Sequence, residues 1–183
     1  FDNNTINGEP WSKYAAGYMW GVTGIIYNPE YVTKEEASTW KIINNDKFRR
    51  KITVKDNVRD TMFAAIGAIK SDKLRSQDFT KQADYTDKLA EEMNDTSKDT
   101  VDEVLEYLQQ VKDNVYSFET DSGKIDAITG KISAGYQWSG DAVYIMQQAE
   151  ANDVELNFAI PEECTNMYFD GWAMLKSGIN GNS

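Results

Sequence analysis

The order of the predicted elements indicates an α/β fold, a mixed sheet of about five strands with helices on both of its faces. Short apolar runs rich in β-branched and aromatic residues alternate along the chain with segments whose apolar residues recur at helical spacing. The 183 residues, 40% of them hydrophobic, fit one domain of ordinary size. Strands that alternate with helices are typical of layered α/β domains.

The first part of the chain is predicted to lead into a buried strand. Residues 1–17 are rich in Asn and Gly, and we expect them to be irregular. Residues 17–28 (GYMWGVTGIIYN) are apolar, aromatic and β-branched, which favours a buried strand. Thr33 and Glu36 have the T-x-x-E spacing of a capping box, which predicts a short helix through Trp40.

The remaining helices and strands are predicted from the periodicity of apolar residues and from helix-capping residues. Residues 50–54 alternate polar and apolar as a strand does, and Asn57 then offers an N-cap to the run VRDTMFAAIGAIK. Apolar spacing predicts further helices over residues 80–95, 99–112 and 139–150. Short β-type runs predict strands over 115–118, 132–138, 154–160 and 167–174. In such sheets ligands bind beyond the strand ends, so chemistry is expected after Val54, Tyr116 and Trp138.

Composition excludes several classes of function. Nineteen Lys and Arg against thirty Asp and Glu give a net charge of −11, which disfavours nucleic acid as a partner. The absence of histidine removes Ser-His-Asp and Cys-His catalysis and His-ligated metals. Cys164 is the one cysteine, so an intrachain disulfide and a thiolate metal cage are excluded too. The sequence predicts neither a cofactor nor a metal, and it has no apolar run near the ~20 residues that span a bilayer.

One amide and one carboxyl side chain, those of Asn57 and Asp60, lie at a predicted strand-to-helix corner. With Asn57 as N-cap, Asp60 occupies the third helical position, one turn along on the same side. Both groups can therefore face a cleft at the edge of the sheet. An Asp at this position is also favoured by the helix dipole alone, so a purely structural role remains open.

Two aromatic segments offer partners for such a carboxylate. Trp138 ends a predicted strand, where it can stack on a ligand or fill the space between helix and sheet. Alternation puts Tyr168, Asp170 and Trp172 on one strand face. An aromatic ring beside a carboxylate suits a cation, because the ring face attracts positive charge and the carboxylate accepts its N–H bonds. A partly wet strand face without a ligand is the alternative.

Taken together, five segments resemble a known family. They are GYMWGVTGIIYNPEYV, TWKI, KITVKDNVRDTMFAAIGAI, KISAGYQWSGDAVYIMQQ and FAIPEECTNMYFDGWAML, in this order. Over residues 15–176 their order and spacing are similar to the second lobe of bacterial spermidine/putrescine-binding proteins, the solute receptors of polyamine ABC transporters. The resemblance implies two α/β lobes with the ligand between them, of which residues 1–183 are one.

This resemblance also implies partners and a location. The flanks 1–14 and 177–183 are expected near the crossovers to the missing first lobe, and the start at Phe1 is expected to reflect processing or excision. The partners implied are a polyamine ligand, the first lobe of the same receptor and a membrane permease. The location implied is the periplasm or, for a lipoprotein, the extracellular face of the membrane.

The resemblance implies which residues of this chain occupy the family's ligand-binding positions. The family's ligand carboxylate falls on Asp60 and its stacking Trp on Trp138, while its aromatic-x-Asp pair falls on Tyr168 and Asp170 and a small hydroxyl residue on Thr120. Asn57 stands where the best-known spermidine receptor has a second Asp, and Tyr168 replaces a Trp. One fewer carboxylate favours a diamine over a triamine, because an unpaired buried ammonium is costly.

Two alternatives stay open on the sequence. A receptor of the same architecture could take another small cationic solute. An enzyme could use Asp60 and Asp170 as acid and base on a glycoside, with Trp138 and Tyr168 stacked on the sugar rings.

Overall fold

The computed structural model describes residues 5–176, and the chain divides into two compact units. The larger unit is Thr23–Asn166, and the smaller one combines Phe1–Val22 with Met167–Ser183. Residues 1–4 and 177–183, which include the predicted C-terminal flank, lie outside the described residues. Each unit is described by itself. That the chain forms a single lobe stays a prediction.

In the larger unit the sheet is mixed, with the strand order β5-β4-β6-β3-β7. Strand β4 is parallel to both β5 and β6, whereas β3 is antiparallel to β6 and β7. The strands are β3 (Ala16–Tyr27, of which Thr23 onward belongs to this unit), β4 (Ile52–Lys55), β5 (Ser117–Glu119), β6 (Ala134–Trp138) and β7 (Asn157–Ala159). The predicted mixed sheet is confirmed.

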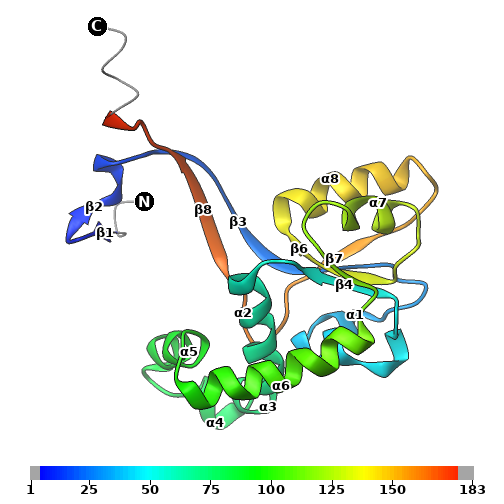
Figure 1. The fold of residues 1–183 in the computed structure, drawn as a ribbon, viewed down its shortest axis with the longest axis horizontal. Coiled ribbons are helices and arrows are strands. Elements are labelled where there is room, and N and C mark those ends of the chain that lie inside the picture. The colour runs from blue at the N-terminus through cyan, green and yellow to red at the C-terminus, as the bar shows by residue number, and fades with distance from the viewer. Residues whose placement is uncertain (1–4, 177–183) are drawn as a thin grey trace, which may run out of the picture. The chain divides into compact units, whose positions relative to one another are not determined.

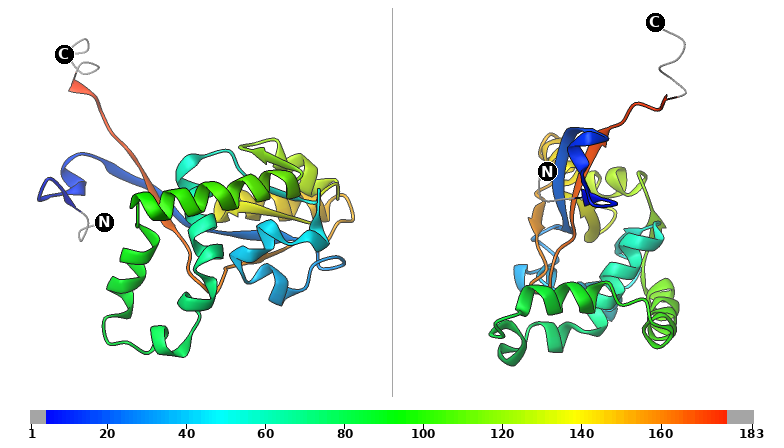
Figure 2. Two further views of the ribbon diagram at one scale, coloured as in Figure 1. Left: turned by 60° about the horizontal axis from the view of Figure 1, so that its bottom comes forward. Right: turned by 90° about the vertical axis from the view of Figure 1, so that its left-hand side faces the viewer.

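Helices cover both faces of this sheet, as the sequence predicts (Figure 1). The helices of the larger unit are α1 (Lys34–Ala37), η2 (Trp40–Asn44), η3 (Asp46–Phe48), α2 (Val58–Ile69), α3 (Ser71–Leu74), α4 (Gln77–Thr80), α5 (Tyr85–Met93), α6 (Lys98–Asn114), α7 (Gly123–Ile128) and α8 (Ser139–Glu150). Helices α2 and α6 lie against one face and α7 and α8 against the other (Figures 1 and 2).

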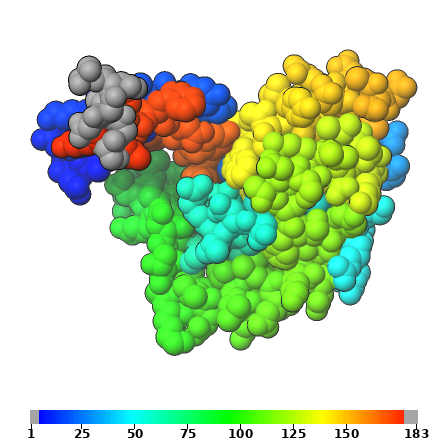
Figure 3. All heavy atoms as spheres, turned by 45° about the horizontal axis from the view of Figure 1, so that its top comes forward, coloured from blue at the N-terminus to red at the C-terminus, as the bar shows by residue number. Residues whose placement is uncertain are grey.

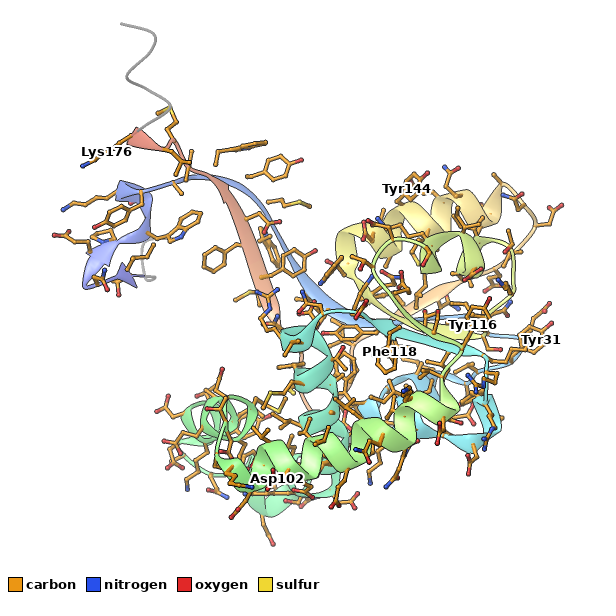
Figure 4. All side chains as sticks on the ribbon, viewed as in Figure 1. Tyr31, Asp102, Tyr116, Phe118, Tyr144 and Lys176 are labelled. Carbon is orange, nitrogen blue, oxygen red and sulfur yellow. The ribbon has the colours of Figure 1, made fainter. Side chains whose placement is uncertain are left out.

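Strand alternation divides the apolar residues between the two faces. Ile25 and Tyr136 pack with Trp40 and the α2 residue Ala64 on one side, while Ile26 packs with α7 and α8 on the other. Figure 4 shows Phe118 between the sheet and α6, in agreement with its packing on the first of these clusters. A third cluster joins α2 to the short helices that follow it.

Three helical predictions need correction. The helix expected over 80–95 is two helices: α4 ends at Thr80 and α5 begins at Tyr85, and the turn between them lets the rings of Phe79 and Tyr85 meet edge to face at 5.6 Å. The capping box at Thr33 is present, but α1 ends at Ala37 and Trp40 opens a separate 3-10 turn. In α6, Val101 and Leu105 are exposed, although they are among the apolar residues whose spacing predicts a helix over 99–112 and were expected to face the sheet.

In the smaller unit, residues 5–22 and 167–176 are described. β1 (Thr5–Ile6) and β2 (Glu9–Pro10) form a hairpin, followed by η1 (Trp11–Lys13). The first half of β3 pairs antiparallel with β8 (Met167–Trp172), with a register shift between Gly17 and Met19. The rings of Trp11 and Phe169 meet edge to face at 5.4 Å.

Residues 17–28 were predicted to be buried throughout, and the first half of that prediction is wrong. The exposed fractions of Tyr18 and Trp20 are 62% and 67%. These rings lie on the ribbon formed by β3 and β8, where the described part of the smaller unit adds only the 3-10 turn η1, whose Trp11 packs on Phe169. Among the described residues, no helix combines the length and the apolar character that crossing a membrane requires.

Candidate functional site

Three parallel strands of the larger unit end at one edge of the sheet, where the candidate residues gather. β4 ends at Lys55, β5 at Glu119 and β6 at Trp138. Because β4 is parallel to both neighbours, all three carboxyl ends lie at the same edge. Helix α2 begins just beyond this edge, and Figure 3 shows its cyan residues on the surface beside the yellow-green residues of the chain around α7. Ligand sites in α/β sheets occupy such edges.

The start of α2 is built as the sequence predicts. The Asn57 side chain caps the helix, with Oδ1 accepting from the backbone N–H of Asp60 at 3.2 Å. Asp60 is the third helical residue and its side chain is completely buried. The cap therefore gives the side-chain oxygen of Asn57 a structural role at the helix start.

Asp60 and Trp138 form a direct contact at this edge. The indole Nε1–H of Trp138 donates to Oδ2 of Asp60 at 3.2 Å. The guanidinium Nε of Arg59 lies 3.4 Å from Oδ1, and the Arg59 side chain is 75% exposed. The two residues that the sequence assigned to ligand binding in different segments, 78 positions apart, are thus hydrogen-bonded.

Beneath them lies a buried ion pair that sequence reasoning missed. The Nζ of Lys55 is 3.4 Å from Oε1 of Glu119, and both side chains are almost wholly inaccessible. The same ammonium donates to the carbonyl of Thr120 at 2.9 Å and lies 4.3 Å from the ring centroid of Trp138. Burial lowers the pKa of Lys55 and the carboxylate of Glu119 raises it, so the pair offsets part of the desolvation penalty.

Other polar groups extend this cluster. Oε2 of Glu119 accepts from the N–H of Gly123, the first residue of α7, at 2.8 Å, and Gln137 donates to Oε1 at 3.3 Å. The Gln137 oxygen is buried without a hydrogen-bond partner. Lys124 pairs with Asp141 at 3.0 Å, which ties α7 to α8. In residues 5–176 no group of three or more acidic or thiol side chains is arranged to hold a metal ion.

Thr120 enters the site through its backbone. Its carbonyl accepts the ammonium of Lys55, and the residue itself is exposed. The hydroxyl role carried over by resemblance therefore stays a prediction.

The other two predicted site residues, Tyr168 and Asp170, lie on β8 in the smaller unit. Strand β8 runs without interruption through Trp172, so alternation keeps these side chains on one face, as predicted. Asp170 is exposed and Tyr168 is partly buried. Their participation in binding stays a prediction.

A cavity of about 410 Å³ adjoins Arg59 in the larger unit. Apolar side chains of α2 and α5, among them Met62, Phe63 and Leu89, form much of its lining. Cys164 also lines it, and burial raises the pKa of this thiol to about 12, which keeps it protonated at neutral pH. The carboxylate that lines this cavity, Asp95, already accepts hydrogen bonds from Ser97 and Thr100. The cavity is therefore a poorer site for an amine than the sheet edge.

Lys55, Arg59, Glu119 and Gln137 were not among the predicted site residues. A lysine at the end of an apolar strand (KITVK), directly before a helix cap, was the available signal for Lys55. Burial and pairing with a residue 64 positions away are tertiary facts that this signal does not contain.

Comparison with known proteins agrees with the resemblance seen in the sequence. The chain is 24% identical over 184 residues to the putrescine-binding periplasmic protein PotF of Escherichia coli, covering 94% of this chain and 45% of that protein. It is 21% identical over 169 residues to spermidine/putrescine-binding periplasmic protein 1 of Haemophilus influenzae, covering 92% and 40%. A putative spermidine/putrescine ABC transporter structure from Listeria monocytogenes shares the fold, with a TM-score of 0.72 at 23% identity over 93% of this chain and 45% of that one.

The chain thus spans less than half the length of these relatives, and the names of the two curated relatives describe binding proteins. A sequence model of one family matches residues 2–179, nearly the whole chain. This chain belongs to the bacterial extracellular solute-binding proteins.

Proposed function

We propose that the chain is the ligand-binding lobe of an ABC importer's solute receptor and that its ligand is a polyamine of the putrescine or spermidine type. A polyamine is a chain of methylenes with ammonium groups at intervals, so its receptor needs carboxylates spaced along flat aromatic walls. The proposed location is the periplasm or the outer face of the membrane. A first lobe and a membrane permease complete the system, and binding rather than catalysis is its task.

The observation that carries this proposal is the Asp60–Trp138 contact. A buried carboxylate joined to an indole edge, at the carboxyl ends of parallel strands, combines the two groups that an alkylammonium ligand requires. The hydrogen bond from Nε1 fixes the plane of the ring, so the ring is preorganised for stacking.

Arg59 must give way for an ammonium to reach Asp60. Its contact to Oδ1 is long at 3.4 Å, and three-quarters of its side chain is exposed. An exposed arginine held by one weak contact moves at little cost. A ligand ammonium would take over the Arg59 position at Oδ1 and leave the Trp138 bond at Oδ2 intact.

The smaller unit contributes a second proposed pair. Tyr168 and Asp170 share a face of β8, and we expect each to take part in ligand binding. Separate variants, Tyr168→Leu and Asp170→Asn, should each weaken binding.

The decisive test is calorimetry on the full-length receptor with Asp60→Asn. Asparagine keeps the size and the acceptor for Trp138 but lacks the charge. We expect polyamine affinity to fall by about 10- to 100-fold, the worth of one charge-assisted hydrogen bond. Asp72→Asn is the matched control, because Asp72 is 94% exposed and pairs with Lys41 on the surface. Absence of putrescine and spermidine binding to the wild type, or equal binding by Asp60→Asn, would reject the proposal.

A second variant tests which polyamine is preferred. Asn57 caps α2, and Asp is an equally good N-cap, so Asn57→Asp adds a carboxylate without breaking the helix start. We expect the wild type to bind putrescine more tightly than spermidine and Asn57→Asp to improve spermidine binding selectively. Tighter spermidine binding by the wild type would contradict this preference.

A further inference from the structure

The proposed function assigns no role to the buried Lys55–Glu119 pair. A fully buried lysine is rare unless it is paired, and this one carries a positive charge into a site proposed to receive positive ligands. Its ammonium lies 4.3 Å from the ring centroid of Trp138, within the range of a cation–π contact. Because Lys55 is completely buried and Trp138 only partly so, the ring face that Lys55 covers is the inner one.

Lys55 is held in this place by several contacts. Glu119 and the Thr120 carbonyl accept from it, and Glu119 is itself anchored by the N–H of Gly123 and by Gln137. A Cβ on Gly123 would come within 2.6 Å of Oε1 of Glu119, so the close approach of α7 to this carboxylate requires glycine. The ammonium is thus a fixed part of the site and cannot swing out as Arg59 can.

A resident cation on one face of a ring weakens the attraction of the opposite face for a second cation. The two charges would lie on either side of one indole, and although Glu119, 3.4 Å from the ammonium, cancels part of their repulsion, the remainder changes affinity by about two- to threefold at protein-surface dielectric. An uncharged methylene segment on the same ring does not suffer this repulsion. The outer face of Trp138 therefore favours the uncharged part of a ligand.

We propose that Lys55 is a specificity-determining residue that limits the number of ammonium groups the site accepts, by excluding charge from the face of Trp138. This inference rests on the proposed function. It assigns to Lys55, a residue outside the predicted ligand set, the discrimination between diamine and triamine, independently of Asn57.

The test is the double variant Lys55→Met/Glu119→Gln in the full-length receptor. It removes the pair together, so that no buried charge is left unpaired and the net charge is unchanged. We expect the ratio of spermidine to putrescine affinity, measured by calorimetry, to rise about two- to threefold. Lys41→Met/Asp72→Asn is the matched control, because it also removes an ion pair as a whole and keeps the net charge, but this pair is exposed, and its ratio should equal that of the wild type.

A second measurement needs no variant. Acetylation of one amine of spermidine keeps the chain and removes one charge, and the wild type should bind this analogue more tightly than spermidine. An unchanged ratio in the double variant, or a wild type that prefers spermidine to its acetylated analogue, overturns the role of Lys55 and leaves the proposed function standing. A wild type that binds none of these amines overturns both.

Discussion

The two halves of strand β3 lie in opposite environments. The half in the smaller unit carries Tyr18 and Trp20, which are mostly exposed, while the half in the larger unit carries Ile25 and Ile26, which are at most 1% exposed. Both halves are apolar and extended, and both pair with antiparallel neighbours. In the larger unit, helices cover each face of the sheet, whereas the described part of the smaller unit has no α-helix and only the 3-10 turn η1.

Apolar composition therefore identifies a strand without saying whether it is covered. Burial depends on the other elements that the chain brings to each face, and those come from distant parts of the sequence. The same holds for charges: the ion pair in the larger unit is buried, whereas Lys13–Glu9 in the smaller unit is half exposed.

The largest effect on the free energy of unfolding is expected when one partner of the buried ion pair is removed. Glu119→Gln leaves the ammonium of Lys55 buried without a counter-ion and should lower the free energy of unfolding by about 3–5 kcal/mol. Glu9→Gln, which removes the exposed partner of Lys13, should change it by about 0.5 kcal/mol or less. Urea denaturation followed by circular dichroism measures both. Equal losses in the two variants would show that burial does not distinguish the pairs.

The next largest effect is expected from two substitutions along β3, one at a buried and one at an exposed position. Ile25→Ala empties a fully buried position and should cost about 2–5 kcal/mol in the free energy of unfolding. Trp20→Ala, at a position 67% exposed, should cost about 1 kcal/mol or less although it removes more atoms. The same denaturation experiment compares them. A larger loss for Trp20→Ala would mean that the ribbon is covered in solution.

The smallest effect concerns a surface turn of the larger unit and depends on pH. Hydrogen bonds from the Thr100 hydroxyl, first, and from the Ser97 N–H lower the pKa of Asp95 below its ordinary value. A lowered pKa in the folded state means that the stabilisation is fully present above the unfolded pKa of about 3.9 and is lost as the pH falls toward the folded pKa.

Melting temperatures measured between pH 6 and 2 should therefore fall less steeply for Asp95→Asn than for the wild type. Asp113→Asn, an exposed change on α6, serves as control and should fall in parallel with the wild type. If the melting temperature of Asp95→Asn fell with pH as steeply as that of the wild type, this turn would be open in solution.

Local signals in the sequence determined the alternation of strands and helices, the helix start at Asn57, the capping box at Thr33 and the strand that ends at Trp138. These features depend on neighbours within a few residues, where propensity and capping act. The same signals placed Asp60 at the third helical position, which the structure confirms.

Tertiary structure alone decided which half of β3 is covered, that Asp60 hydrogen-bonds Trp138, and that Lys55 pairs with Glu119 beneath the ring. Each of these depends on strand order: β4 lies between β5 and β6, so residues far apart in the sequence end at one edge of the sheet. Local propensity carries no information about which strands become neighbours, because pairing is settled by the burial of both faces of the sheet at once.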